Sequence, residues 1–224
     1  PIIELGLHHE MQHQELICTD IKYTLGLNPL YPPAIKRDDV WWEAPEPEAI
    51  RWLGFDEGVN EIGATGDDFV YDNELPRHRQ YCNAFKLASR PVTNGEYLEF
   101  MEDGGYSKVN LWLSEGWDIV KEKKWFAPLH WNKVGGEWHE YTIHGLIPLQ
   151  PHLPVCHLSA HEAFAMASWA GARLPTEAEL ELALAEQGDM TGQFLSLEGP
   201  VHPLLQRNRG GFNSLAGGVW EWTQ

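Results

Sequence analysis

The sequence predicts an α+β protein in which one long helix precedes a domain of short strands and short helices. Apolar residues recur at helical spacing over residues 1 to about 27, and glycine-punctuated segments of strand character follow residue 48. Three capping boxes mark helix starts further along the chain. With 43% hydrophobic and 12% aromatic residues among 224, the chain has enough apolar side chains for a folded core.

The first predicted element is a helix that occupies residues 1–28. It ends near Gly26, and the following Asn28-Pro29 is typical of a helix stop. A single helix cannot bury its own apolar stripe, so we expect it to be the last helix of a bundle, with further sequence upstream of Pro1. The stripe consists of Ile2, Leu5, Leu16 and Ile17. The proline-rich residues 29–48 suit an extended linker, which leaves residues 49–224 as a second domain.

The second domain opens with short strands, predicted at residues 50–55, 59–63 and 85–88. Each capping box pairs a threonine or serine with a glutamate three residues later and predicts a helix start. The three pairs are Thr93 with Glu96, Ser159 with Glu162, and Thr176 with Glu179. Between the first two lies an aromatic region, residues 112–138, whose lack of regular signals predicts a functional loop.

Charge and cysteine content exclude several classes of partner and setting. The formal net charge of -17 repels phosphate backbones and anionic surfaces, so we expect no nucleic acid and no membrane as a partner. No apolar run of about 18 residues predicts a membrane span. Cys18, Cys82 and Cys156 are too widely spaced for a metal knuckle or a disulfide framework, and buried thiols in a reducing cytoplasm are the simplest expectation.

The strongest chemical signal is the stretch of residues 8–15, His-His-Glu-Met-Gln-His-Gln-Glu. His9 and His13 are four residues apart, so on a helix their imidazoles converge and can bind one metal ion. Their position along the apolar stripe predicts that they face a packed interior. Gln12 follows His9 by three residues on the same side, within reach of anything bound there.

Two other interpretations of this stretch remain open on spacing alone. A buried histidine is more often a hydrogen-bonded core residue than a ligand. His9-Glu10-x-x-His13 also fits the zinc-protease pattern, in which the glutamate is the general base, but that short pattern often matches by chance.

The order of several longer motifs resembles the formylglycine-generating-enzyme-like, or sulfatase-modifying-factor, domain over about residues 50 to 224. The motifs lie at residues 69–78, 90–97, 154–159, 169–179 and 218–223. The resemblance implies an irregular mixed fold related to C-type lectins. Two positions depart from the family pattern, because Leu180 stands where tryptophan is usual and Gly218 stands where asparagine or aspartate is usual.

The N-terminal helix resembles the end of a DinB-like helical bundle. A DinB-like bundle joined to this domain is characteristic of the ergothioneine-biosynthesis sulfoxide synthases. The resemblance implies a non-haem Fe(II) held by three histidines, two of them matching His9 and His13, with the third on an earlier bundle helix. It also implies that the chain continues past Gln224, where the family carries substrate-binding and proton-donating residues.

The chemistry implied is O2-dependent joining of a cysteine-containing thiol, γ-glutamylcysteine or cysteine, to hercynine. Three nitrogen ligands on an octahedral iron leave three positions for thiolate, imidazole and oxygen. By family analogy Gln12 contacts the substrate. No spacing argument selects a general acid among the tyrosines. The alternatives are a DinB-type metal-dependent thiol transferase and a non-catalytic lectin-like ligand-binding module.

Overall fold

The computed structural model describes residues 2–37, 44, 46–65, 69–188, 192–196, 198–206 and 211–224. Its α-helices are α1 (Ile2–Gly26), α2 (Asn94–Glu102), α3 (Ser114–Lys123), α4 (Ala160–Trp169) and α5 (Glu177–Gln187). Its strands are β1 (Trp52–Phe55), β2 (Gly58–Ile62), β3 (His78–Cys82), β4 (Phe85–Ala88), β5 (Trp131–Val134), β6 (Glu137–Thr142) and β7 (Gly145–Pro148). The mixture of helices with small sheets confirms the coarse α+β prediction.

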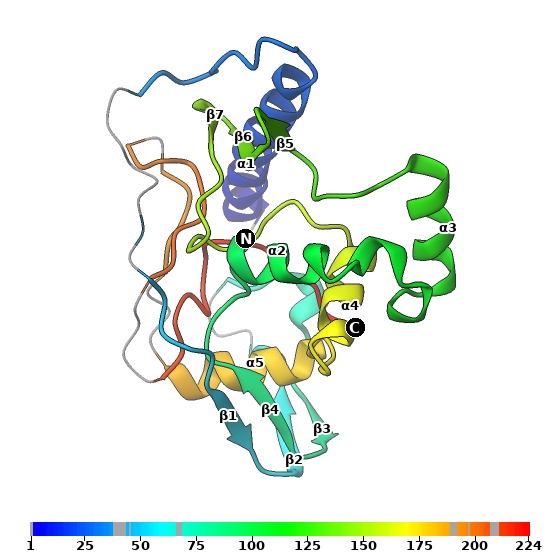
Figure 1. The fold of residues 1–224 in the computed structure, drawn as a ribbon. Coiled ribbons are helices and arrows are strands. Elements are labelled where there is room, and N and C mark those ends of the chain that lie inside the picture. The colour runs from blue at the N-terminus through cyan, green and yellow to red at the C-terminus, as the bar shows by residue number, and fades with distance from the viewer. Residues whose placement is uncertain are drawn as a thin grey trace.

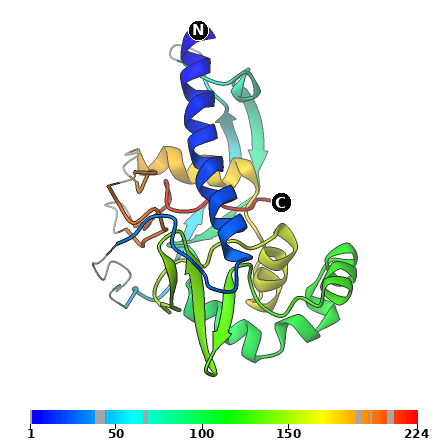
Figure 2. The ribbon, with the colours of Figure 1, turned by 90° about the horizontal axis from the view of Figure 1, so that it is seen from above.

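The strands form three small antiparallel sheets. β1 pairs with β4, β2 pairs with β3, and β5, β6 and β7 form a meander. Figure 1 shows the meander beside α1 at one end of the molecule and the two strand pairs at the other, with α2, α4 and α5 between them. Figure 2 shows α1 running along the domain, with the N-terminus at one extremity.

Three helices begin at the predicted capping boxes. Thr93, Ser159 and Thr176 each accept a hydrogen bond from the backbone N–H three residues later, and the glutamate there bonds back to the cap. The capping pattern is local in sequence, so it predicts these helix starts without knowledge of the tertiary structure. The strands β1, β2 and β4 also lie where the sequence predicted them, within a residue or two.

The prediction of a functional loop over residues 112–138 is wrong. The segment contains α3, β5 and the start of β6, and Trp112, Val120 and Trp131 are buried in the main hydrophobic core. The other buried members of that core are Tyr97, Phe100, Ala165 and Met166. The aromatic richness of this segment therefore serves packing, because large rings bury much apolar area.

α1 stands apart from that core. Of its side chains only Lys22 is buried, while the apolar residues Ile2, Leu5, Leu16 and Ile17 are 82%, 45%, 56% and 55% exposed. The prediction that this stripe faces a packed interior is therefore wrong for the described domain, which contacts a different face of the helix. α1 is also not apolar enough to cross a membrane, nor is any other described helix.

Candidate functional site

A large pocket lies between α1 and the body of the domain, with a volume of about 1780 Å³. One wall is the α1 segment that contains Glu15, Cys18, Thr19 and Lys22. The opposite walls come from the end of β4 and the start of α2, from residues 155–158, and from the C-terminal segment. The long helix therefore closes one side of the candidate site.

The face of α1 that meets the domain is marked by residues at a spacing of seven. His8 stacks on Phe69 with 4.4 Å between ring centroids, and the indole N–H of Trp220 donates a hydrogen bond to the Glu15 carboxylate. Seven residues further, Lys22 is 7% exposed. Seven residues are two helical turns, so these three side chains form one stripe, which we call the docking face.

Lys22 enters a polar cluster with the buried Glu140 and His202 and the half-buried Cys156 and His157. Its ammonium lies 2.6 Å from Nε2 of His157 and 3.5 Å from Oε1 of Glu140. The Cys156 thiol donates to the same carboxylate oxygen at 3.5 Å, and Nε2 of His202 lies 3.7 Å from Oε2. We call these five residues the Lys22 cluster. It joins α1 to β6 and to the segments before α4 and near the C-terminus.

The histidines around Lys22 are neutral at pH 7. Burial, together with the Lys22 charge, lowers the pKa of His157 well below its usual value. Burial also lowers the pKa of His202 and of the neighbouring His130 to about 4. A neutral imidazole has one nitrogen that accepts, so the Lys22 ammonium donates to Nε2 of His157.

Three members of the Lys22 cluster have the donor atoms of a metal site. A carboxylate oxygen of Glu140, Sγ of Cys156 and a ring nitrogen of His157 lie within 4.8 Å of one another. However, the Lys22 ammonium already contacts two of them. Burial and the Glu140 charge raise the pKa of the Cys156 thiol, so it remains protonated and is a poor metal ligand. The arrangement suits a lysine cation better than a metal ion.

The predicted metal ligands His9 and His13 lie close together, with 4.5 Å between ring centroids. Both side chains are exposed, as is Gln12, so the prediction that the imidazoles face a packed interior is wrong for the described domain. Neither imidazole forms a hydrogen bond with any residue that the structure describes, and no third histidine, cysteine or carboxylate of that part joins them in a group. The pair suits an ion that takes further ligands from elsewhere.

The histidine pair and the docking face occupy different sides of α1. At 100° per residue, His9 and His13 lie roughly 120–160° around the helix from the docking face. Gln12 lies between the docking face and the histidine pair, roughly 60° from the docking face. A ligand shared by the histidine pair and the pocket would therefore pass Gln12.

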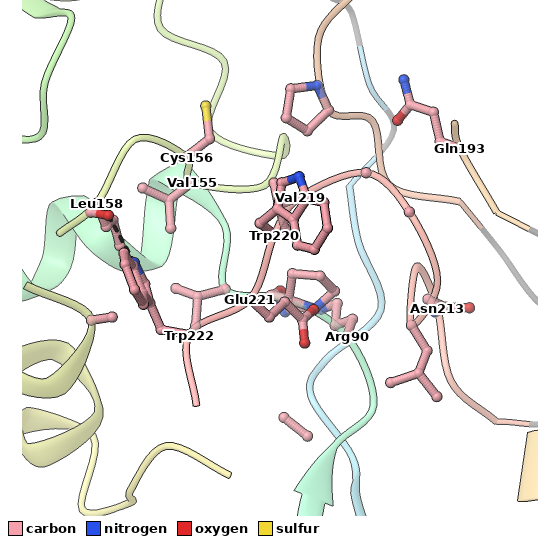
Figure 3. Close-up of a pocket in the computed structure, with 18 of the residues that line it drawn as sticks. Arg90, Val155, Cys156, Leu158, Gln193, Asn213, Val219, Trp220, Glu221 and Trp222 are labelled. Carbon is pink, nitrogen blue, oxygen red and sulfur yellow. Dashed lines mark hydrogen bonds between the residues drawn. The ribbon is translucent and has the colours of Figure 1, made fainter. Parts of the chain in front are cut away.

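The C-terminal segment places two tryptophans and a glutamate in the pocket. Figure 3 shows Trp220, Glu221 and Trp222 in sequence along this segment, and the indole N–H of Trp222 donates to the carbonyl of Leu158 at 2.9 Å. The Glu221 side chain lines the pocket and is exposed to solvent there. Neighbouring protein atoms remove part of the hydration of its carboxyl group, which raises the pKa of Glu221 to about 7.

Two arginine–glutamate pairs stiffen the pocket rim. Arg90 and Arg173 donate two hydrogen bonds each to Glu96 and Glu179, at 2.6 to 3.0 Å. In both cases the arginine is three residues before the capping threonine and the glutamate three residues after it. These arginines are therefore committed to holding helix starts, and the pKa values of both glutamates are lowered, with the arginine bonds contributing strongly.

Sequence reasoning missed the Lys22 cluster and Glu221. Within the cluster, the contact between Lys22 and His157 alone joins residues 135 positions apart, so no local pattern indicates it. A signal was available in α1 itself, because His8, Glu15 and Lys22 repeat every seven residues. Glu221 sits within the recognised motif at residues 218–223, although the motif gave no reason to single out its carboxylate. Gly218, in the same motif, has φ +78°, a value that glycine, asparagine and aspartate adopt most easily. This explains why glycine can stand where the family usually has asparagine or aspartate.

The short paired strands, the capped helices and the pocket lined by a C-terminal tryptophan motif define an irregular α+β domain with a ligand-sized site. The chain belongs to the family described as "Sulfatase-modifying factor enzyme 1-like domain", whose model matches residues 54–203. This confirms the predicted family resemblance over residues 54–203.

Among curated proteins the chain is similar to hercynine oxygenases, to an ergothioneine biosynthesis protein and to formylglycine-generating enzymes. It is 34% identical over 182 residues to the hercynine oxygenase of Mycobacterium tuberculosis, covering 72% of this chain and 42% of that protein. It is 30% identical over 163 residues to ergothioneine biosynthesis protein 1 of Schizosaccharomyces pombe, covering 69% and 19%. The bovine formylglycine-generating enzyme is 31% identical over 140 residues, covering 55% and 36%. The matched region thus spans less than half the length of these relatives.

Proposed function

We propose that this chain is part of a non-haem Fe(II), O2-dependent sulfoxide synthase that joins a cysteine-containing thiol to hercynine in ergothioneine biosynthesis. The names of its relatives in Mycobacterium tuberculosis and Schizosaccharomyces pombe support this. The observation that carries the proposal is the histidine pair of α1, on the helix that forms one wall of the pocket.

His9 and His13 would hold the iron together with a third ligand from a DinB-like bundle. The residues fit, because their rings approach to 4.5 Å and make no competing hydrogen bond with described residues. Under this proposal residues 1–28 are the last bundle helix, 29–48 a linker and 49–224 the second domain. The exposed apolar side chains beside the pair support it, since a stripe of this kind requires cover. Bound iron would supply the activation of O2.

The overall reaction balances without a further reductant. A thiol S–H and an imidazole C–H are lost, one C–S bond forms, one oxygen atom of O2 becomes the sulfoxide, and the other leaves as water with both hydrogens. The chain's own residues bind and orient the substrates. Glu15, Glu221 and Trp220 give the pocket an acidic and aromatic wall, which suits the trimethylammonium group of hercynine.

Gln12 would contact the substrate as it extends from the pocket toward the metal. Its place on α1, between the docking face and the histidine pair, supports this role. We expect Gln12→Ala to raise the KM for hercynine about tenfold, with the iron content unchanged. Gln14→Ala is the matched control, because Gln14 is exposed on the same helix and lies on another side. Equal KM values for the two variants would show that Gln12 does not contact hercynine.

The test is an anaerobic Fe(II) titration of the full-length protein, followed by hercynine, γ-glutamylcysteine or cysteine, and O2, with mass analysis of the product. A species with the mass of thiol plus hercynine plus one oxygen, less two hydrogens, supports the proposal and identifies the thiol. Turnover with zinc in the absence of O2 would instead indicate a thiol transferase.

Two further outcomes would contradict the proposal, the first in this assay and the second in a separate protease assay. Ligand binding without turnover of any thiol would indicate a binding module. Casein cleavage that Glu10→Gln abolishes would indicate a metalloprotease, whereas the proposal predicts that Glu10→Gln leaves iron binding and product formation unchanged.

A further inference from the structure

We propose that Lys22 is a positioning residue, whose buried ammonium fixes α1 against β6 and so sets where the histidine pair stands relative to the pocket. This inference rests on the proposed function of that pair. It assigns a role to the one buried side chain of the fully described helix Ile2–Gly26.

Lys22 connects parts of the chain that are distant in sequence. Its partners Glu140 and His157 lie 118 and 135 residues further on, in β6 and in the segment before α4. The remaining contacts of the docking face involve the more exposed His8 and Glu15. The Lys22 cluster is therefore the buried attachment of the helix to the domain.

The energetics of buried charge make this attachment specific. An ammonium removed from water is costly unless charged and polar partners surround it. Glu140, 2% exposed, supplies the opposite charge, and neutral His157 supplies an acceptor at 2.6 Å. If α1 slid or rotated, the ion pair between the ammonium and the carboxylate would break while both charges remained buried. The cluster therefore fixes both the register and the rotation of the helix.

The backbone around the cluster is held in an uncommon conformation. His157 and His130 have φ values of +61° and +73°, in the left-handed region that residues other than glycine seldom adopt. Their rings pack edge to face with 4.9 Å between centroids. Such conformations persist only where the surroundings enforce them and gather at functional positions. Here they bring an acceptor, His157, to the lysine.

The lever arm from Lys22 to the histidine pair is long. Lys22 is nine residues from His13 and thirteen from His9, so the pair lies roughly 13–20 Å along the axis at 1.5 Å per residue. A small change of tilt at Lys22 therefore shifts the pair by more than an ångström, and misplacement on that scale slows reactions strongly.

The experiment compares four variants of the full-length protein: Lys22→Met, Glu140→Gln, both together, and Lys121→Met. Lys121 is the matched control, since its pair with Asp118 at 2.9 Å is exposed. We expect Lys22→Met to lower kcat at least tenfold with the Fe(II) content unchanged, because the ligand pair is intact. The double variant removes both charges and should recover most of this loss, while Lys121→Met stays within twofold of the unaltered protein.

A second readout does not depend on activity. Peptide mapping gives the alkylation rate of Cys156, a member of the Lys22 cluster, with Cys82 in a separate core as internal reference. Loss of the ammonium disfavours the Cys156 thiolate, so faster alkylation in Lys22→Met reports opening of the contact. We expect at least a tenfold increase relative to Cys82. If Lys22→Met does not fold, the double variant and Glu140→Gln provide the comparison.

The two readouts separate this inference from the proposed function. Unchanged kcat and unchanged alkylation in Lys22→Met would overturn the positioning role while the synthase activity stands. Faster alkylation in a protein that never forms the sulfoxide would overturn the synthase proposal and retain the attachment. The unaltered protein is also titrated with Co(II). A thiolate-to-cobalt absorption band that Cys156→Ser removes would overturn the positioning role of Lys22, since a metal would then occupy the place of the ammonium.

Discussion

The two sides of α1 meet different surroundings. The docking face contacts the domain through a ring stack, a hydrogen bond and a buried ammonium. The other side carries His9 and His13 among apolar side chains that the described domain leaves exposed. The polar side is thus the one packed on this domain, whereas amphipathic helices usually present their apolar stripe to the body they pack on. The histidine side is therefore the one that remains for the bundle required by the proposed function.

The largest expected effect comes from a substitution that changes only the histidine side of α1. His13→Ala removes one of two adjacent imidazoles, so we expect product formation in the full-length protein to fall at least a thousandfold. The docking face should be unaffected, and Cys156 should alkylate at the unaltered rate. An anaerobic Fe(II) titration and the product assay measure the loss. Gln14→Ala, on the same helix, should keep full activity, and a His13→Ala protein that retains turnover would contradict the metal role.

The next largest effect comes from a substitution that weakens the attachment of the docking face. Glu140→Ala leaves the Lys22 ammonium buried without its counter-charge, which costs about 3–5 kcal/mol of unfolding free energy. Urea unfolding of the two proteins gives the difference. The control is Glu61→Ala, which removes an ion pair with Arg79 whose side chains are 48% and 79% exposed, and exposed pairs contribute at most about 1 kcal/mol. Equal losses would show that the Lys22 cluster is not a buried pair in solution.

A pH change weakens the same cluster without mutation. The pKa of His202 is about 4 in the folded protein, below the usual 6.5, so between these values the unfolded chain binds the proton and the folded chain does not. The free energy of unfolding therefore falls as the pH falls, by about 2 kcal/mol for this histidine between pH 7 and 5. Urea unfolding at both pH values measures it. A His202→Asn variant should show a shallower dependence, and an identical slope would contradict the assignment.

The smallest expected effect concerns the exposed end of the docking face. Glu15→Ala removes the acceptor of the Trp220 indole N–H, a partly exposed hydrogen bond worth about 1 kcal/mol. Thermal unfolding compares it with Glu10→Ala, an exposed residue of the same helix away from the docking face, which should change stability by less than about 0.5 kcal/mol. A larger loss in Glu10→Ala would show that a second body covers that side of α1.

Local signals in the sequence predicted part of this fold and no more. The capping boxes at Thr93, Ser159 and Thr176 are complete within four residues, so they needed no tertiary information. α3 was missed because Leu113 precedes it without a side-chain cap. The β5–β6 hairpin was missed although Gly135-Gly136 is a two-residue turn signal.

For the site, the spacing of four predicted that His9 and His13 approach each other, and they do. It could not predict which side of α1 the domain contacts. That choice depends on Glu140 and His157, more than 100 residues away, whose positions follow from the β6 register and a left-handed backbone. Long-range electrostatic partners of this kind leave no periodic trace in a single sequence.

Because one continuous helix carries both sides, the proposed function implies a thermodynamic link between the pocket and the histidine pair. Suppose that a ligand in the pocket binds more tightly when α1 is seated by Lys22, and that seating also favours an ion at His9 and His13. The ion then raises the affinity for the ligand by the same factor by which the ligand raises the affinity for the ion. A buried lysine would in this way turn two neighbouring binding sites into a cooperative pair.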